Sequence, residues 1–323
     1  MPSTLTLADY AQLAPTNIER GVIDVFRRES FILDSLGFEA AGGLQKTVIR
    51  SAGLPAVGFR KIGEGWSSSK ASFEPITERV FDLGGDIDVD KLLVKADPSQ
   101  MGKHTEAFVT AISYEFNDYF INGSPIVDPD GFTGIWYRLV NYLSSRQTVS
   151  GSGVDISPNA GAGLAANFDT VLDLLDELAH VVDGHAPAMF VLNEQLFLRL
   201  NSALRQNGLW SQDENSFGLQ ITRYGPSGPA IIDLGVMADQ VTQIIGNLEH
   251  DAGSDFTSGD ATSIYAMRTG GMYLNGLQLY PMDVNPIGLL QDGVTYRTVI
   301  DWPMGIMHEN PRALARAVGI VAA

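Results

Sequence analysis

The 323-residue chain contains no cysteine, and this absence removes several classes of function at once. Without thiols there are no disulfides, no thiolate metal sites and no cysteine nucleophiles. No apolar run approaches the roughly 18 residues that a membrane-spanning helix requires. The first residues carry no basic segment followed by an apolar one, so export is not indicated. We therefore expect a soluble protein, made in the cytoplasm, with no membrane partner.

Positive charge is also scarce. Lys and Arg number 21 against 38 Asp and Glu, which gives a formal net charge of −17. A field of this sign repels a phosphate backbone, so direct nucleic-acid binding is not expected to be the main role. The charge does not prevent the protein from forming a wall around nucleic acid. The 45% hydrophobic content is enough for one large domain or two smaller cores.

The common catalytic motifs are missing from the sequence. No Gly-x-Ser-x-Gly nucleophile elbow, Gly-x-Gly-x-x-Gly dinucleotide motif or phosphate-binding Gly-x-x-x-x-Gly-Lys-Ser/Thr loop occurs. An acidic hydrolase that uses a pair of carboxylates stays open as an alternative, although no spacing singles out a pair. We predict that the chain is not an enzyme and that it has no catalytic residues and no cofactor.

Two groupings were weighed as metal ligands. Asp86, Asp88 and Asp90 resemble the start of a calcium loop, but Lys91 and Asp97 stand where such a loop needs Gly and Glu. A solvated or intersubunit strand face is the favoured interpretation of the three carboxylates. His180 and His185 are five residues apart around Gly184, which indicates the C-terminus of a helix rather than two ligands on one helix face. We predict no metal site.

The most informative feature that is present is a long ribbon. Residues 44–97 are mostly extended with period-two alternation, and a two-stranded hairpin of this kind is marginal in water unless it lies on another surface. Gly63, Gly65 and the serines of the tip indicate a mobile loop. The strands are predicted at residues 46–50, 57–62 and 73–81.

Trp66 at the tip of this ribbon has no local core to cover it, which indicates contact with a partner surface. Lys70, close to it, could pair across subunits, although an ordinary solvated lysine is the favoured interpretation. The candidate intersubunit contacts are Arg60, Lys61, Trp66, Lys70 and Phe73 in the ribbon, with Arg27, Arg28 and Phe31 before it.

The rest of the chain alternates between helices and strands. A helix over 99–121 is predicted, with Phe108, Ile112, Phe116 and Phe120 on one stripe and Asn122-Gly123 as the stop. Asp128-Pro129-Asp130-Gly131 indicates a turn. The further predictions are an irregular or helical segment over 1–40, helices over 167–183 and after Asn193, strands over 188–192, 230–234, 262–268, 277–280 and 294–300, and a C-terminal helix over 310–319.

In this order the elements resemble a tailed-bacteriophage major capsid protein of the Hong Kong 97 type. The likeness covers essentially the whole chain and is most sequence-like over residues 22–30, 301–306 and 310–316. It implies an α+β fold with an N-arm, an extended β-hairpin called the E-loop, a P-domain with a long spine helix, and an α/β A-domain. The implied divisions are the N-arm 1–43, the E-loop 44–83, the first part of the P-domain 84–130, the A-domain 131–261, and the returning strands with a C-terminal helix 262–323.

The resemblance also implies the function and the partners. Copies of the chain would assemble into hexamers and pentamers of an icosahedral head, which encloses double-stranded DNA without sequence-specific binding. A separate scaffolding protein, a portal and decoration proteins are possible partners, and the location is the virion. Gly58, Gly63, Gly65, Gly84 and Gly85 would let the ribbon bend during maturation. The alternatives are an encapsulin-like nanocompartment shell, the acidic hydrolase, and a phage tail or decoration component.

Overall fold

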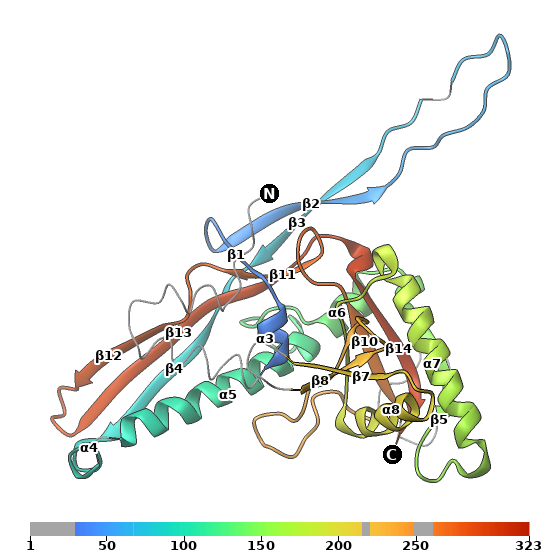
Figure 1. Cartoon of the computed structure of the whole chain (residues 1–323). Helices are drawn as coiled ribbons and strands as arrows, with labels where there is room; N and C mark the ends of the chain where they lie inside the picture. The colour runs from blue at the N-terminus through green and yellow to red at the C-terminus, as the bar shows by residue number, and fades with distance from the viewer. Residues whose placement is uncertain (1–29, 67, 98, 215–219, 248–260, 323) are drawn as a thin grey trace.

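The computed structural model describes residues 30–66, 68–97, 99–214, 220–247 and 261–322. These residues form a body built of helices and two larger sheets, from which one thin two-stranded ribbon projects (Figure 1). The predicted α+β class is therefore confirmed. Among the helices in these ranges, none is both long enough and apolar enough to cross a membrane.

The ribbon is a hairpin of β2 (Gln45–Gly53) and β3 (Ser72–Arg79), paired antiparallel with Arg50 opposite Glu74. The prediction of a further strand at 57–62 is wrong, because the described residues between β2 and β3 form no strand. Pro55 follows the end of β2 and has no N–H to donate to a ladder, which accounts for the end of regular pairing there.

One half of the body combines a long helix with a five-stranded sheet. Helix α5 (Gln100–Asn122) confirms the predicted helix and ends where the Gly123 N–H donates to the Tyr119 carbonyl at 3.0 Å. Phe116 and Phe120 of its predicted stripe are fully buried, and Phe108 is partly buried. The other elements of this half are β1 (Phe38–Ala40), β4 (Phe81–Asp90), α4 (Lys91–Ala96), β11 (Leu274–Gln278), β12 (Asp283–Leu289) and β13 (Thr295–His308).

The other half holds a seven-stranded sheet in the order β5-β14-β10-β6-β9-β8-β7. Both of its faces are buried, because Phe190 and Leu192 pack in a core with α7 and α8 while Met189 and Val191 pack in the core that contains α5. The predicted helices and central strands are confirmed. The elements are α6 (Ile135–Asn141), β5 (Thr148–Asp155), α7 (Leu164–Val181), β6 (Met189–Leu192), α8 (Glu194–Gln206), β7 (Trp210–Glu214), β8 (Gln220–Tyr224), β9 (Ala230–Asp233), β10 (Ala261–Met267) and β14 (Leu314–Val321).

The predicted C-terminal helix over 310–319 is wrong. Asn310 and Pro311 do start a helical turn, in which the Asn310 side chain accepts from the Arg312 N–H at 2.9 Å, but it is a single 3-10 turn over Pro311–Ala313. The chain then enters β14, a central strand that pairs antiparallel with β10 and parallel with β5. Burial against both neighbours favours the extended form over the helix that the local start signal indicates.

The segment before the ribbon also differs from the prediction. Its described part contains the short helix α3 (Phe31–Ser35) and β1, and the side chains of Ile32, Leu33 and Leu36 are buried in the main core of the same chain. Phe38 packs on the buried Trp302 with ring centroids 5.2 Å apart. Residues 30–41 are therefore packed into the body of the same chain.

Gly84 and Gly85 do not lie in the ribbon, which corrects their proposed role as bending points. Both belong to β4 and pair with β13, where Gly84 stands opposite Asp301 and Gly85 opposite Ile300. A Cβ atom on Gly84 would lie 2.1 Å from the Ile300 carbonyl oxygen. Glycine is required there because the backbones approach closely, not because the chain must flex.

Candidate functional site

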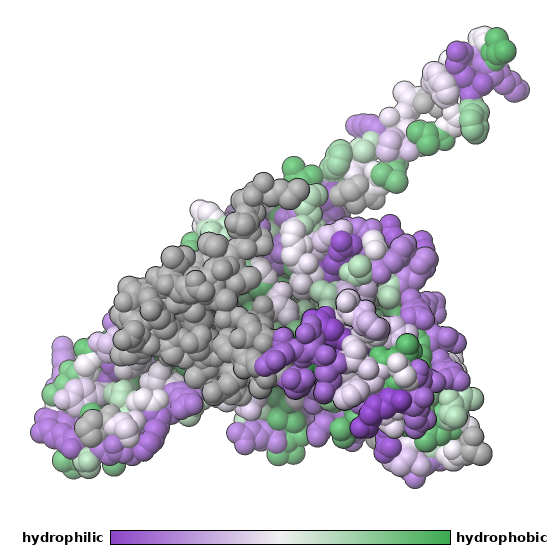
Figure 2. Space-filling model, viewed as in Figure 1, coloured by the Kyte–Doolittle hydropathy of each residue, from purple (hydrophilic) through white to green (hydrophobic). Residues whose placement is uncertain are grey.

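The distal part of the hairpin exposes large apolar side chains that no described part of the chain covers. Leu54 and Val57 are 89% and 94% exposed, and Phe59 and Ile62 are fully exposed. Figure 2 shows hydrophobic side chains along the projecting ribbon with the body well away from them. Exposed apolar residues gathered on one projection mark a contact surface.

The structure brings two of the predicted contact residues together. The Arg60 guanidinium lies 5.7 Å from the centroid of the Trp66 ring, and Arg60 Nη1 donates to the Glu64 carbonyl at 3.0 Å. Trp66 is nevertheless 67% exposed, so the cation–π contact leaves much of its ring free. Lys61 and Lys70 are exposed and join no such cluster.

The remaining predicted contacts are spread over the molecule. Phe73 lies on β3 and is 65% exposed. Phe31 is half-buried against the core of its own chain, so at most part of its surface is free for a neighbour. Arg27 and Arg28 lie outside the described residues. The role of all eight residues as intersubunit contacts remains a prediction.

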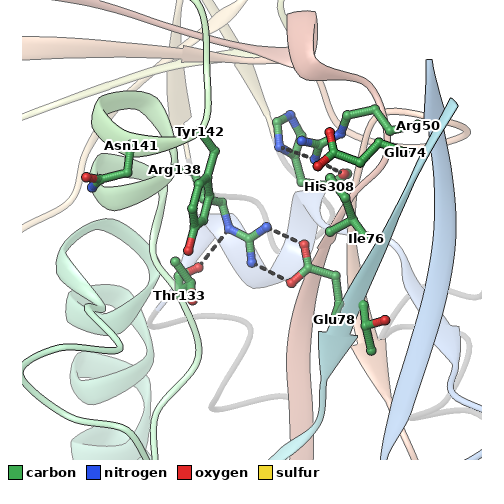
Figure 3. A pocket seen from close by; sticks show the side chains of 10 residues that line it. Arg50, Glu74, Ile76, Glu78, Thr133, Arg138, Asn141, Tyr142 and His308 are labelled. Carbon is green, nitrogen blue, oxygen red and sulfur yellow. Dashed lines mark hydrogen bonds and ion pairs between the residues drawn. The ribbon is translucent and has the colours of Figure 1, made fainter. Parts of the chain in front are cut away.

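Four residues, which we call the hairpin root, join the hairpin to the body: Arg50, Glu78, Arg138 and His308 (Figure 3). Within this group, a buried ion pair between Glu78 and Arg138 holds β3 to the body. Arg138 comes from α6, and its guanidinium makes two bonds to the Glu78 carboxylate, one of them at 2.9 Å. The two side chains are only 4% and 12% exposed, which makes this the most buried ion pair among the described residues. Removing either partner of such a pair leaves the other charge buried and unpaired, which strongly destabilises the fold.

Arg50 makes a second contact, between β2 and the end of β13. Its Nη2 donates to the His308 carbonyl at 2.6 Å and lies 3.3 Å from His308 Nδ1, while its Nε donates to the Glu309 carbonyl at 3.3 Å. Burial, and then the positive charge of Arg138, lower the pKa of Arg50. Because a guanidinium can only donate, Nδ1 of His308 accepts and the proton of the neutral ring is on Nε2.

A cavity of about 450 Å³ lies between the hairpin root and α6. Its walls are mainly polar, and Figure 3 shows Arg138 of α6 facing Glu78 of β3, with Arg50 of β2 beside His308. The cavity is lined by Arg50, Glu74, Ile76, Thr77, Glu78, Thr133, Arg138, Asn141, Tyr142 and His308.

His308 gives this region a dependence on pH. Its burial, followed by the charges of Arg138 and Arg50, holds the pKa of His308 well below the ordinary value of 6.5. Below pH 6.5 the unfolded chain therefore binds a proton that the folded chain does not, and the unfolding free energy should fall by about 1.4 kcal/mol per pH unit until the folded pKa is reached. Above pH 6.5 this contribution is constant.

We expect His308→Gln to remove this part of the pH dependence, measured as the denaturation midpoint of the unassembled chain between pH 7.5 and pH 5. His104→Gln is the matched control, because His104 is exposed on α5. Equal slopes for the parent chain and the His308 variant would contradict the assignment.

Sequence reasoning missed the four residues of the hairpin root. Arg50 and His308 are 258 positions apart in the sequence, and Glu78 and Arg138 are 60 apart, so no local spacing joins them. The one available signal was a charged residue, Arg50, directly after the apolar residues Val48 and Ile49. That signal points to a partner without identifying it.

The groupings weighed as metal ligands have other partners. Arg297 of β13 pairs with Asp86 at 2.9 Å and with Asp88 at 2.6 Å, while Asp90 accepts from the Leu92 N–H at 2.7 Å and so caps α4. Within the described ranges, no group of three or more His, Asp or Glu side chains is placed to hold a metal ion.

The predicted helix end and turn are both present. His180 and His185 stack with centroids 4.2 Å apart at the end of α7, where His185 Nδ1 bonds to the His180 carbonyl. At the turn after α5, the Asp130 N–H donates to Asp128 Oδ1 at 3.0 Å.

Comparison with known proteins finds one matching family and several solved structures with a similar fold. Residues 16–165 match the family of the major capsid protein GP7. The solved structures that resemble the chain include the SrpI encapsulin complex from Synechococcus elongatus PCC 7942, at 14% identity over 98% of this chain and 96% of that one, with a TM-score of 0.61. No curated protein matches the sequence.

Two phage-related structures are similar over nearly the whole chain. The capsid of a native GTA particle shares 13% identity over 90% of both chains with a TM-score of 0.57. A chain from Mycobacterium phage Bobi shares 11% identity over 91% of both chains with a TM-score of 0.56. At these identities the likeness establishes the fold, and the predicted Hong Kong 97 type of fold is confirmed.

Proposed function

We propose that the chain is a major capsid protein of the Hong Kong 97 type, located in the virion, and that its copies form the hexamers and pentamers of an icosahedral phage head. The head would enclose double-stranded DNA without reading its sequence. In keeping with the family, the role of the chain is structural, and we propose that it has no enzymatic activity.

The observation that carries this proposal is the uncovered hairpin. Phe59, Ile62 and Trp66 would be left in water by an isolated chain, whereas a neighbouring copy would cover them. Burial of apolar area stabilises association by about 25 cal/mol per Å². Each copy would lay its hairpin on the next, so that closed symmetry repeats a modest contact many times.

We propose the following division of the chain by analogy with the family. The hairpin 44–83 serves as the E-loop, α5 as the spine helix of the P-domain, and the region 131–261 as most of the A-domain. The last strand, β14, then belongs to the A-domain sheet, since it pairs with β5 and β10. The N-arm would consist of the residues before α3, because α3 and β1 are part of the body.

The net charge of −17 supports enclosure of DNA rather than tight binding to it. Synthesis in the host cytoplasm, a separate scaffolding protein, a portal and decoration proteins complete the proposal. An encapsulin-like nanocompartment is the second candidate, favoured by the similarity to the SrpI encapsulin chain. The two candidates differ in content, since one encloses DNA and the other a protein cargo.

The test is to express the full chain, alone and with its neighbouring genes, and to measure its assembly by sedimentation velocity and electron microscopy. We expect closed particles built of hexamers and pentamers, with nucleic acid inside when the packaging genes are present. Particles that hold protein cargo and no nucleic acid would support the nanocompartment instead. A stable monomer with hydrolase activity, whose amides over 44–83 are protected from exchange at high dilution, would overturn both candidates.

A further inference from the structure

Polar contacts attach the hairpin to the body at two levels along its length. At the first level Glu78 of β3 meets Arg138, and Lys46, which stands opposite Glu78, makes a more exposed ion pair with Glu39 of β1. At the second level Arg50 of β2 meets the end of β13. Because Arg50 stands opposite Glu74 in the register, the two attachment points are four residues apart along the ribbon. At about 3.3 Å per residue this is roughly 13 Å. With a single contact the hairpin could rotate about it, whereas two separated contacts fix the direction of the hairpin relative to the body.

The body side of the ion pair is held rigidly. Arg138 Nε donates to the Thr133 carbonyl at 2.9 Å, and Nη2 also donates to the Ile306 carbonyl at 3.3 Å. These bonds fix the guanidinium plane independently of the hairpin. Glu78 is therefore the member of the pair that would move with the hairpin, and Arg138 the member that would stay.

The space between the attachment points is not filled by packed side chains. The cavity of about 450 Å³ lies on the body side of β3, next to Glu74 and Ile76. Apolar packing of the ribbon on the body involves Val80 at its base and Val48, which stands opposite Ile76 between the two levels; both contact a small cluster with Ala41, Leu277 and Met307. On the side of β3 that faces the cavity, the polar contacts are what resists a tilt of the hairpin.

We propose that the Glu78–Arg138 pair and the Arg50–His308 contact form a clamp that fixes the direction in which the hairpin leaves the body. Release of the ion pair lets the hairpin swing about its base. A buried charge is strongly disfavoured once its partner is withdrawn. The clamp is therefore either closed or open, without stable intermediate positions. The proposal rests on the assembly function, because in a shell this direction sets the angle between neighbouring copies.

The test measures the hairpin direction in the unassembled chain. The absence of cysteine allows two spin labels to be attached specifically at Ser72→Cys on the hairpin and Asp173→Cys on α7. Pulsed electron resonance then reports the distance between them. Glu78→Gln removes the ion pair with little change in shape, and Glu64→Gln is the matched control, because Glu64 is exposed on the hairpin loop away from the clamp residues.

We expect one narrow distance distribution for the parent chain and for Glu64→Gln, and a shifted or second distance for Glu78→Gln. Arg50→Met opens the other contact and keeps the ion pair, so it tests the clamp even if Glu78→Gln does not fold. An unchanged narrow distribution in the folded Glu78 or Arg50 variant would overturn the clamp. Particle diameters provide the second readout: no particles from any chain would refute the assembly function, whereas parent-sized particles from Glu78→Gln would refute only the clamp.

Discussion

Deleting residues 54–71 and joining Gly53 to Ser72 through an Asn-Gly turn is expected to abolish closed shells while the body still folds. Gly53 and Ser72 are already paired at the end of the ribbon, so a two-residue turn closes the shortened hairpin. The deleted segment carries Leu54, Val57 and Phe59, whose exposure shows that the body does not depend on them.

The expected effect is large because every copy in a shell loses the same contact. A loss of about 1.4 kcal/mol weakens one contact tenfold, and the losses multiply when many contacts must hold together. Sedimentation velocity should show only small species, and the thermal midpoint of the unassembled chain should stay close to that of the parent.

A narrower variant separates the apolar contacts from the length of the hairpin. Phe59→Ser with Ile62→Ser should reduce shell yield strongly, and Glu64→Ala, an exposed polar position on the same loop, should not. Normal shells from the deletion variant would show that the distal hairpin is not an assembly contact.

The second large effect is expected at the hairpin root. Arg138→Leu should lower the unfolding free energy of the unassembled chain by about 3–5 kcal/mol, because it leaves the Glu78 carboxylate buried without its partner. Replacing both residues, as Arg138→Leu with Glu78→Leu, should recover most of that loss, since neither charge is then buried. Chemical denaturation followed by tryptophan fluorescence measures both changes.

Arg297→Leu is the control for this comparison. Arg297 also bridges two strands, through Asp86 and Asp88, but its side chain is considerably more exposed. Solvent screens such pairs, so we expect a clearly smaller loss. If Arg138→Leu and Arg297→Leu cost the same, or if the double variant is no more stable than Arg138→Leu alone, the pair at the root is not structurally important.

Local patterns were sufficient for the long helices and for the ribbon. The stripe that includes Phe116 and Phe120 and the stop at Gly123 predicted α5 because both signals lie within one element. Alternation predicted the paired strands of the hairpin for the same reason. Where a segment lacked a partner strand, as at 57–62, alternation alone overstated the regular structure.

Long-range pairing decided what local patterns did not. Residues 314–321 follow a helix start signal at Asn310-Pro311 and nevertheless form β14, because β5 and β10 supply ladder partners on both sides. Similarly, the resemblance assigned the apolar residues of α3 to the N-arm, and only the structure shows that they are buried beside α5 and Trp302.

The sequence by itself determined the class of the protein: an acidic chain without cysteine, with helices and strands in the order of a capsid protein and a ribbon too thin to stand alone. Only the tertiary structure decided how that ribbon is held. Arg50, Glu78, Arg138 and His308 meet from four separate elements, and their proximity depends on the path of the whole chain. Periodicity records which face of an element is apolar, but it carries no information about which distant charge will be buried against it.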